Sequence, residues 1–138
     1  PDVFYNHIIR VGFSTSSKFN PRNVNLAMTF PSRLNSYISS FNANNIYNSD
    51  KLLYAFTITR RCIGPVLYNT TMPGCDWSKD KIIGLLMNIR HNESIAPCFY
   101  HASKLSMLKH YPKYGLVYTA FLYKWYGLCI RLYRMRKK

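Results

Sequence analysis

The chain has 138 residues, of which 48% are hydrophobic and 16% aromatic. This composition excludes a mainly disordered protein and favours one small domain, with or without an extension. Nineteen lysines and arginines stand against five aspartates and glutamates, which gives a formal net charge of +14 and a pI near 9.9. So basic a surface repels itself unless a polyanion covers it, so the partners to consider are nucleic acid and an acidic lipid surface.

The first half of the chain shows little clean periodicity. Phe4 to Val11 is expected to form a short strand or turn, and Ser14 to Asn23 to form loop. A short helix is predicted from Phe30, because Pro31 suits the first helical position and one face carries Leu34, Ile38 and Phe41. Asn42 to Asp50 is expected to be a polar turn or loop.

The segment Lys51 to Thr59 (KLLYAFTIT) is apolar and β-branched near its end, which favours a strand, with a helix as the alternative. Gly64-Pro65 and Pro73-Gly74 are strong breakers, and the second pair predicts a boundary near residues 73–75. Residues 1–74 are therefore expected to be an irregular extension with short helix and strand segments that needs partners to hold it.

A helix is predicted downstream of this boundary. Asp76 or Ser78 can cap a helix that begins near Lys79. Its apolar residues recur at i, i+3, i+4 and i+7, as Ile82, Leu85, Leu86 and Ile89.

The remaining elements complete an expected α+β domain over residues 75–134. Ser94 to Tyr100 contains Pro97 and suits an edge strand, and His101 to Tyr111 suits a second helix. That helix is expected to bury Ala102, Leu105 and Leu108. Leu116 to Tyr123 and Gly127 to Tyr133 alternate in polarity and predict two strands of a hairpin. The order is helix, strand, helix, strand, strand, followed by a basic tail over residues 135–138.

Catalytic and metal-binding patterns are weak. Acids are too few for a carboxylate pair, and the sequence has no phosphate-binding loop, dinucleotide fingerprint or H-E-x-x-H motif. A Cys98–His101 nucleophile pair is disfavoured against an inert cysteine, and zinc is disfavoured because no C-x-x-C pair exists. Reduced thiols are the expectation, and a disulfide framework stays open. We expect no enzyme, no cofactor and no small-molecule substrate.

Membrane insertion is not expected. The longest apolar run, Tyr114 to Ile130, is interrupted by Lys124 and is shorter than the roughly 20 apolar residues of a spanning helix.

The cations predict a nucleic-acid interface. The last acid is Glu93, and the cations after it meet no countercharge, namely Lys104, Lys109, Lys113, Lys124, Arg131, Arg134, Arg136, Lys137 and Lys138. A basic run is often only a solvated face, but one without any acid favours a polyanionic partner. Rings are interleaved with these cations, as in Tyr123-Lys124-Trp125-Tyr126, and RNA recognition combines cations for phosphates with aromatic faces for unstacked bases.

Three short motifs resemble a known family. They are Asp80-x-Ile82-x-x-Leu85-Leu86-x-x-Ile89-Arg90, then Ser103-Lys104-Leu105, then Gly115-Leu116-Val117. Together with the expected element order they resemble the amino-terminal half of the small-subunit ribosomal protein S-eight family, over about residues 76–134. The family's carboxy-terminal half, with its Ser-Thr-Ser-x-Gly loop, has no counterpart here. The resemblance implies an rRNA-binding structural protein and adds Arg90, His91, Ser103 and Lys104 as RNA contacts.

The prediction is thus a structural rRNA-binding protein of a small ribosomal subunit, in contact with rRNA and neighbouring ribosomal proteins. The chain is rich in Asn, Ile, Lys and Tyr, whose codons are AT-rich, and this favours a mitochondrial ribosome. One alternative is an accessory subunit of an organellar membrane complex. The other is a small disulfide-bonded secreted or viral protein.

Overall fold

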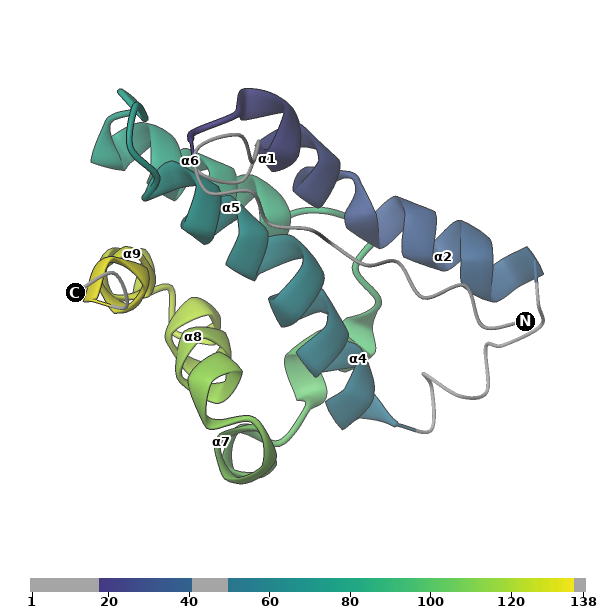
Figure 1. Cartoon of the computed structure of the whole chain (residues 1–138). Coiled ribbons are helices and arrows are strands. Elements are labelled where there is room, and N and C mark those ends of the chain that lie inside the picture. Colours follow the sequence, from purple (N-terminus) through teal and green to yellow (C-terminus); the bar gives the residue numbers. More distant parts are fainter. Residues whose placement is uncertain (1–17, 41–49, 136–138) are drawn as a thin grey trace, which may run out of the picture.

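The computed structural model describes residues 18–40 and 50–135, and within these ranges the chain forms helices and no strand (Figure 1). The elements are α1 Pro21–Met28, α2 Phe30–Ser40, α4 Lys51–Ile58, a π-helical turn Thr59–Ile63, α5 Gly64–Thr70, α6 Lys79–Arg90, a 3-10 helix Pro97–His101, α7 Lys104–His110, α8 Pro112–Leu122 and α9 Tyr126–Met135. The α+β prediction is therefore wrong, and the described fold is all-helical.

The two expected hairpin strands are the helices α8 and α9. In α9 the buried residues recur at i, i+3, i+4 and i+7, as Tyr126, Cys129, Ile130 and Tyr133. In α8 they fall in adjacent pairs one turn apart, as Val117, Tyr118, Ala120 and Phe121. Both segments are so apolar that they also contain an alternating pattern, and the helical set is the one that the core selects. The expected edge strand over 94–100 is likewise wrong, because Pro97–His101 is a 3-10 helix.

The predicted break at Gly64-Pro65 is absent, because α4, the π-helical turn and α5 run on as one helix from residue 51 to residue 70. It crosses the centre of Figure 1 diagonally. Pro65 lacks an N–H and would crowd the carbonyl one turn before it in an ordinary helix. The wider turn just ahead, in which the Gly64 N–H donates to the Thr59 carbonyl, accommodates the proline within the helix. The strand favoured for 51–59 is thus a helix, which was the alternative.

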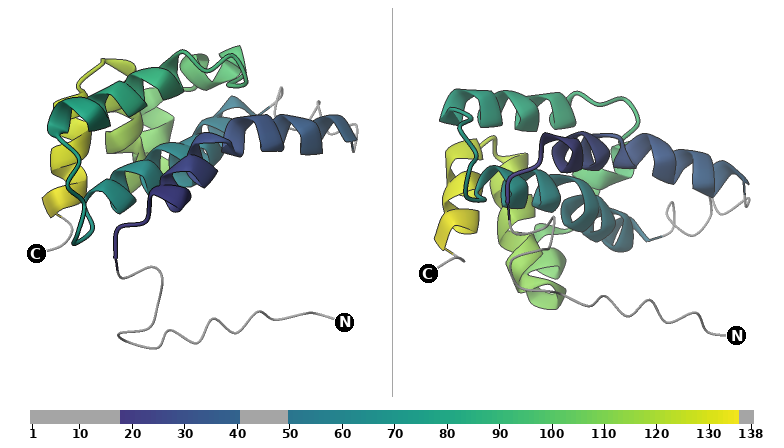
Figure 2. Two further views of the ribbon diagram at one scale, coloured as in Figure 1. Left: turned by 90° about the horizontal axis from the view of Figure 1, so that it is seen from above. Right: turned by 45° about the horizontal axis from the view of Figure 1, so that its top comes forward.

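One hydrophobic core spans both sides of the expected boundary at residues 73–75. Val24 and Ile38 from α1 and α2 belong to the same buried cluster as Ile82 of α6 and Phe121 of α8. The helix α1 packs on α5, α8 packs on both α7 and α9, and Figure 2 shows α1 and α2 alongside the central helix with α6 as an outer layer. The first half of the described chain is therefore helical and part of the core, where a loop-rich extension was expected.

Two predicted helices are confirmed. The helix α6 begins after Ser78, whose Oγ accepts a hydrogen bond from the Lys81 N–H at 3.2 Å, and it buries Ile82, Leu86 and Ile89. In α2, Leu34 and Ile38 are buried behind Pro31. Phe41 and the segments expected at 4–11 and 42–49 lie outside the described residues.

The helix expected over 101–111 exists as α7, and of its expected buried residues Ala102 is buried and Leu108 half-buried, but Leu105 is not. Leu105 is 77% exposed, and Met107 is the fully buried residue. Ser103 caps the helix by accepting from the Ser106 N–H at 3.2 Å. The helix α7 begins at Lys104, three residues later than expected, and its buried face carries Met107 in place of Leu105.

All four cysteines lie in described segments and none forms a disulfide. Cys62 and Cys129 are buried, and burial raises the pKa of each thiol from 9.0 to about 12. Burial also raises the pKa of Cys98. Thiols with a raised pKa are poor nucleophiles and poor metal ligands. Within residues 18–40 and 50–135, no group of three or more His, Cys, Asp and Glu side chains could hold a metal ion.

No helix in the described part of the chain is both long enough and apolar enough to cross a membrane.

Candidate nucleic-acid interface

Arg90, predicted to contact RNA, is used by the fold. It is half-buried at the end of α6, and its Nη1 donates to the carbonyl oxygens of Phe121 and Leu122, each at 3.2 Å. These carbonyls belong to the last turn of α8, where they lack the N–H four residues later that a continuing helix would supply. The guanidinium also lies 5.8 Å from the centre of the Tyr100 ring, whose hydroxyl donates to the Arg90 carbonyl oxygen at 2.6 Å. Arg90 therefore joins α6 to α8.

Replacing Arg90 with alanine is expected to lower the free energy of unfolding by about 1–2 kcal/mol, because two carbonyls lose a charged donor. The exposed Arg131 is the matched control, and Arg131→Ala is expected to change stability by less than about 0.5 kcal/mol. Urea denaturation measures both. In RNA titrations the Arg90→Ala variant is expected to show the same dependence of log affinity on log salt concentration as the wild type. A weaker salt dependence would show that Arg90 contacts a phosphate.

His91 and Ser103 also serve helix ends. The His91 Nδ1 lies 2.8 Å from the Met87 carbonyl oxygen while the ring stays exposed. Ser103 is the N-cap of α7. Arg90, His91 and Ser103 thus make contacts at helix ends. Of the four residues implied by the ribosomal resemblance, Lys104 is the one whose charged group takes no part in such a contact.

The other predicted cations in the described chain lie at the surface. Exposed cations from α7, α8, the α8–α9 turn and α9 are Lys104, Lys109, Lys113, Lys124, Arg131 and Arg134. Arg136, Lys137 and Lys138 lie outside the described residues. The structure thus places six of the predicted cations on consecutive elements, and no acid occurs among residues 94–135.

A compact group of rings and cations stands at the α8–α9 turn. We name Lys104, Tyr123, Lys124 and Trp125 the turn cluster. The rings of Tyr123 and Trp125 have centroids 5.2 Å apart and planes 28° from parallel, and they are 52% and 56% exposed. The Lys104 Nζ lies 5.4 Å from the Tyr123 ring centre, within reach of a cation–π contact.

The backbone of this turn is tightly held. The Lys124 N–H donates to the Phe121 carbonyl at 3.0 Å, and the Trp125 N–H donates to the Ala120 carbonyl at 2.8 Å. These two bonds define a Schellman motif, in which the residue after the helix adopts the left-handed conformation. Lys124 has φ 59°. Glycine usually occupies this position, and a residue with a Cβ costs roughly 1–2 kcal/mol there.

A second aromatic group was missed by the sequence analysis. Phe56 of α4 stacks on Tyr111 at 3.9 Å and 15°, contacts Tyr114 edge-on at 5.4 Å, and has the Arg60 guanidinium 5.7 Å from its ring centre. Arg60 is exposed and also lines a shallow pocket with Tyr114 and Tyr133. The signal was the i, i+4 spacing of Phe56 and Arg60, which has meaning only on a helix. Because a strand was favoured for 51–59, this spacing carried no weight.

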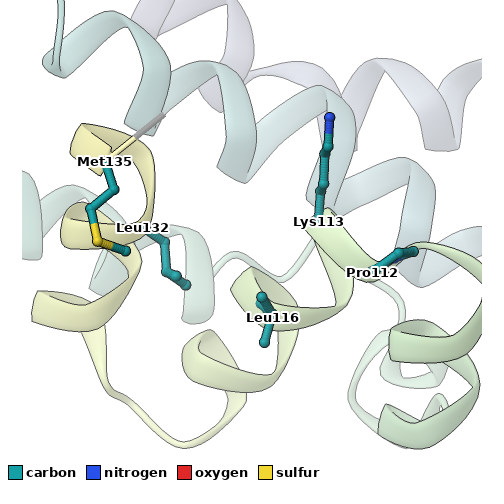
Figure 3. Close-up of a pocket in the computed structure, with 5 residues that line it drawn as sticks. All are labelled: Pro112, Lys113, Leu116, Leu132 and Met135. Atoms are coloured by element: carbon teal, nitrogen blue, oxygen red, sulfur yellow. The ribbon is translucent and has the colours of Figure 1, made fainter. Parts of the chain in front are cut away.

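An apolar groove lies between α8 and α9, and Lys113 is the one cation that lines it. Figure 3 shows Leu116 of α8 and Leu132 and Met135 of α9 around the groove, with Pro112 and Lys113 at the start of α8. Its volume is about 300 Å³. The lining is aliphatic apart from one lysine, so the groove offers few groups to orient a small polar substrate and suits apolar side chains of a protein.

Comparisons with protein families, with curated proteins and with solved structures found no match for this chain. The function must therefore be argued from the surface itself. The element order that accompanied the ribosomal resemblance is not present, since helices occupy the expected strands. What remains is a set of exposed cations on α7, α8 and α9, two of which accompany the exposed rings of Tyr123 and Trp125, and this combination suits phosphates and unstacked bases.

Proposed function

We propose that this protein is a structural RNA-binding component of a ribonucleoprotein, and that it acts without catalysis. The observation that carries the proposal is the set of exposed cations on α7, α8, the α8–α9 turn and α9, in a stretch of sequence that has no acid. Two of them, Lys104 and Lys124, accompany the exposed rings of Tyr123 and Trp125. Cations of this kind bind phosphates and release counterions, which supplies most of the affinity for RNA.

The small ribosomal subunit of mitochondria is the particle that we propose for it. Support comes from the abundance of Asn, Ile, Lys and Tyr, whose codons are AT-rich, and from the short motifs at Asp80–Arg90 and Ser103–Leu105. The apolar groove between α8 and α9 supports contact with neighbouring proteins of the same particle.

Binding of the full chain to a labelled RNA tests the proposal. Fluorescence anisotropy at salt concentrations from 50 to 300 mM is expected to show affinity that falls steeply with salt, by about 0.7 in log–log slope for each phosphate contact on a single strand. The triple variant Lys109→Gln, Arg131→Gln and Arg134→Gln is expected to reduce this slope by about 2. No binding at 50 mM salt would overturn the proposal.

A matched control removes the same charge from other elements. Lys18, Arg22 and Lys51 are exposed on the early helices and the segments before them, and their replacement by glutamine also lowers the net charge by three. This variant is expected to keep most of the salt slope. If both triple variants lose the same slope, the interface is not confined to α7, α8 and α9.

Sedimentation of cell extracts tests the particle. The protein is expected to sediment with the mitochondrial small ribosomal subunit and to be released by RNase. Release by detergent and not by RNase would support the membrane-complex alternative. Sedimentation with another RNase-sensitive particle would keep the RNA-binding proposal and overturn the ribosomal one.

A further inference from the structure

The turn cluster has a lysine at a position where glycine would adopt the same left-handed conformation without strain. Two main-chain hydrogen bonds hold the α8–α9 turn, and both bonds would form equally well with glycine at position 124. The chain instead has Lys124 in the left-handed conformation, at φ 59°. A strained residue that the fold does not require points to a function of its side chain.

The rings on either side of Lys124 are arranged as a stack that is open to solvent. Tyr123 and Trp125 lie 28° from parallel and each has more than half of its surface exposed. An exposed pair of this kind presents π surface on which a nucleobase can continue the stack. Two cations accompany the rings, since Lys104 reaches the Tyr123 ring from α7 and Lys124 lies between the two aromatic residues.

We propose that the turn cluster stacks an unpaired base of single-stranded RNA, with Lys104 and Lys124 contacting the phosphates beside it. This inference rests on the proposed RNA binding and names the form of RNA that the site takes. Bases in a duplex are already stacked and paired, whereas unpaired bases are free to stack on aromatic side chains. The site therefore discriminates single strands from duplexes without reading a particular sequence.

An anionic membrane surface is the competing partner, because Trp, Tyr and Lys also gather at membrane interfaces. The stacked geometry favours RNA. A base extends a near-parallel pair of rings, whereas binding among lipid headgroups does not require the two rings to stack on each other.

Fluorescence of Trp125 tests the site directly. The chain has two tryptophans, so the Trp77→Phe variant leaves Trp125 as the reporter, with circular dichroism to verify its fold. We expect a ten-nucleotide oligouridylate to quench Trp125 at 50 mM salt, and a blunt duplex of equal length to quench it much less. Trp125→Leu in the otherwise wild-type chain is expected to weaken oligouridylate binding about tenfold while changing duplex binding less than twofold.

A substitution at Lys124 is expected to change the stability of the fold and the affinity for RNA in opposite directions. Lys124→Gly is expected to raise the melting temperature, since it relieves the left-handed strain, and to lower oligouridylate affinity several-fold. Lys124→Arg is the matched control, and it is expected to keep both values near those of the wild type. A purely structural turn would show the gain in stability with no loss of affinity.

Three outcomes overturn the inference, and they differ from failure of the proposed function. If the wild type binds RNA but Trp125→Leu binds oligouridylate equally well, the turn cluster is not the stacking site and RNA binding stands. If duplex and single strand quench Trp125 equally, the preference for unpaired bases is wrong. If vesicles of phosphatidylglycerol shift Trp125 emission and RNA does not, the cluster binds lipid. Only the absence of any salt-dependent RNA binding removes the proposed function as well.

Discussion

Replacing Gly115 with alanine is expected to lower the free energy of unfolding by about 1–3 kcal/mol. A Cβ at this position would lie 2.7 Å from the Leu108 Cα, the Leu108 nitrogen and the Met107 carbonyl carbon. These are main-chain atoms of α7, which cannot rotate aside as the end of a side chain can. The two helices must therefore separate or tilt, and overpacking of this kind is costly.

The helix-forming preference of alanine acts in the opposite direction by about 1 kcal/mol, so a second glycine serves as the control. Gly84 lies within α6, and a Cβ there would meet nothing within 4 Å. Gly84→Ala is expected to stabilise the protein by about 0.5–1 kcal/mol. Urea denaturation of both variants measures the contrast, and a shift of the same sign in both would contradict the close approach of α7 and α8.

Raising the pH from 8 to 10.5 is expected to destabilise the protein by about 4 kcal/mol through two thiols. Burial raises the pKa of Cys62 and that of Cys129 to about 12 in the folded state, against 9.0 for an unperturbed thiol. Below pH 9 the thiols are protonated in both states and cost nothing. Above pH 9 the unfolded thiols lose protons while the folded ones do not, so stability falls by about 1.4 kcal/mol per thiol per pH unit until about pH 12.

The double variant Cys62→Ala and Cys129→Ala isolates this effect. It is expected to be less stable than the wild type at pH 8, because buried sulfur is removed, and to lose less stability on the way to pH 10.5. Burial also raises the pKa of Tyr118 and of Tyr100, so part of the alkaline slope persists in the variant. Equal slopes in the two proteins would show that the thiols titrate normally.

Prediction from sequence succeeded where a local signal had one physical reading. Ser78 followed by the spacing of Ile82, Leu86 and Ile89 admits only a capped helix, and α6 is that helix. Pro31 at the start of α2 is a similar case. The two expected strands at 116–123 and 127–133 do correspond to two separate elements, α8 and α9, although Tyr126 of the short link between them belongs to α9.

Prediction failed where nearly every residue is apolar. In residues 51–59 and 114–133 an alternating set and a helical set of apolar positions coexist, so the period alone does not decide between strand and helix. The breaker at Gly64-Pro65 failed for a different reason. A π-helical turn accommodates the proline within the helix. Gly64 has no side chain, which leaves room for the Tyr133 hydroxyl of α9 against the continuous helix.

The candidate site was predicted in part. Lys104, Lys109, Lys113, Lys124, Arg131 and Arg134 are exposed, as a basic surface requires. The structural role of Arg90 could not be predicted because its partners, the carbonyls of Phe121 and Leu122, lie more than 30 residues away in the chain. Arg60 was missed because its neighbour Phe56 faces it only on a helix.

The sequence by itself determined the basic character of this protein, the absence of acids after Glu93, and the starts of α6 and α2, because charge counts, a capping serine and a proline at a helix start act locally. Only the tertiary structure decided that the described fold is all-helical, that Arg90 holds α6 to α8, and that Tyr123 and Trp125 stack beside a strained Lys124. The physical reason is the same for all three. Each depends on contacts between distant parts of the chain, or on whether an apolar segment forms a strand or a helix. Such a segment contains both the alternating and the helical spacing of apolar residues, and the packing of the core selects one of them.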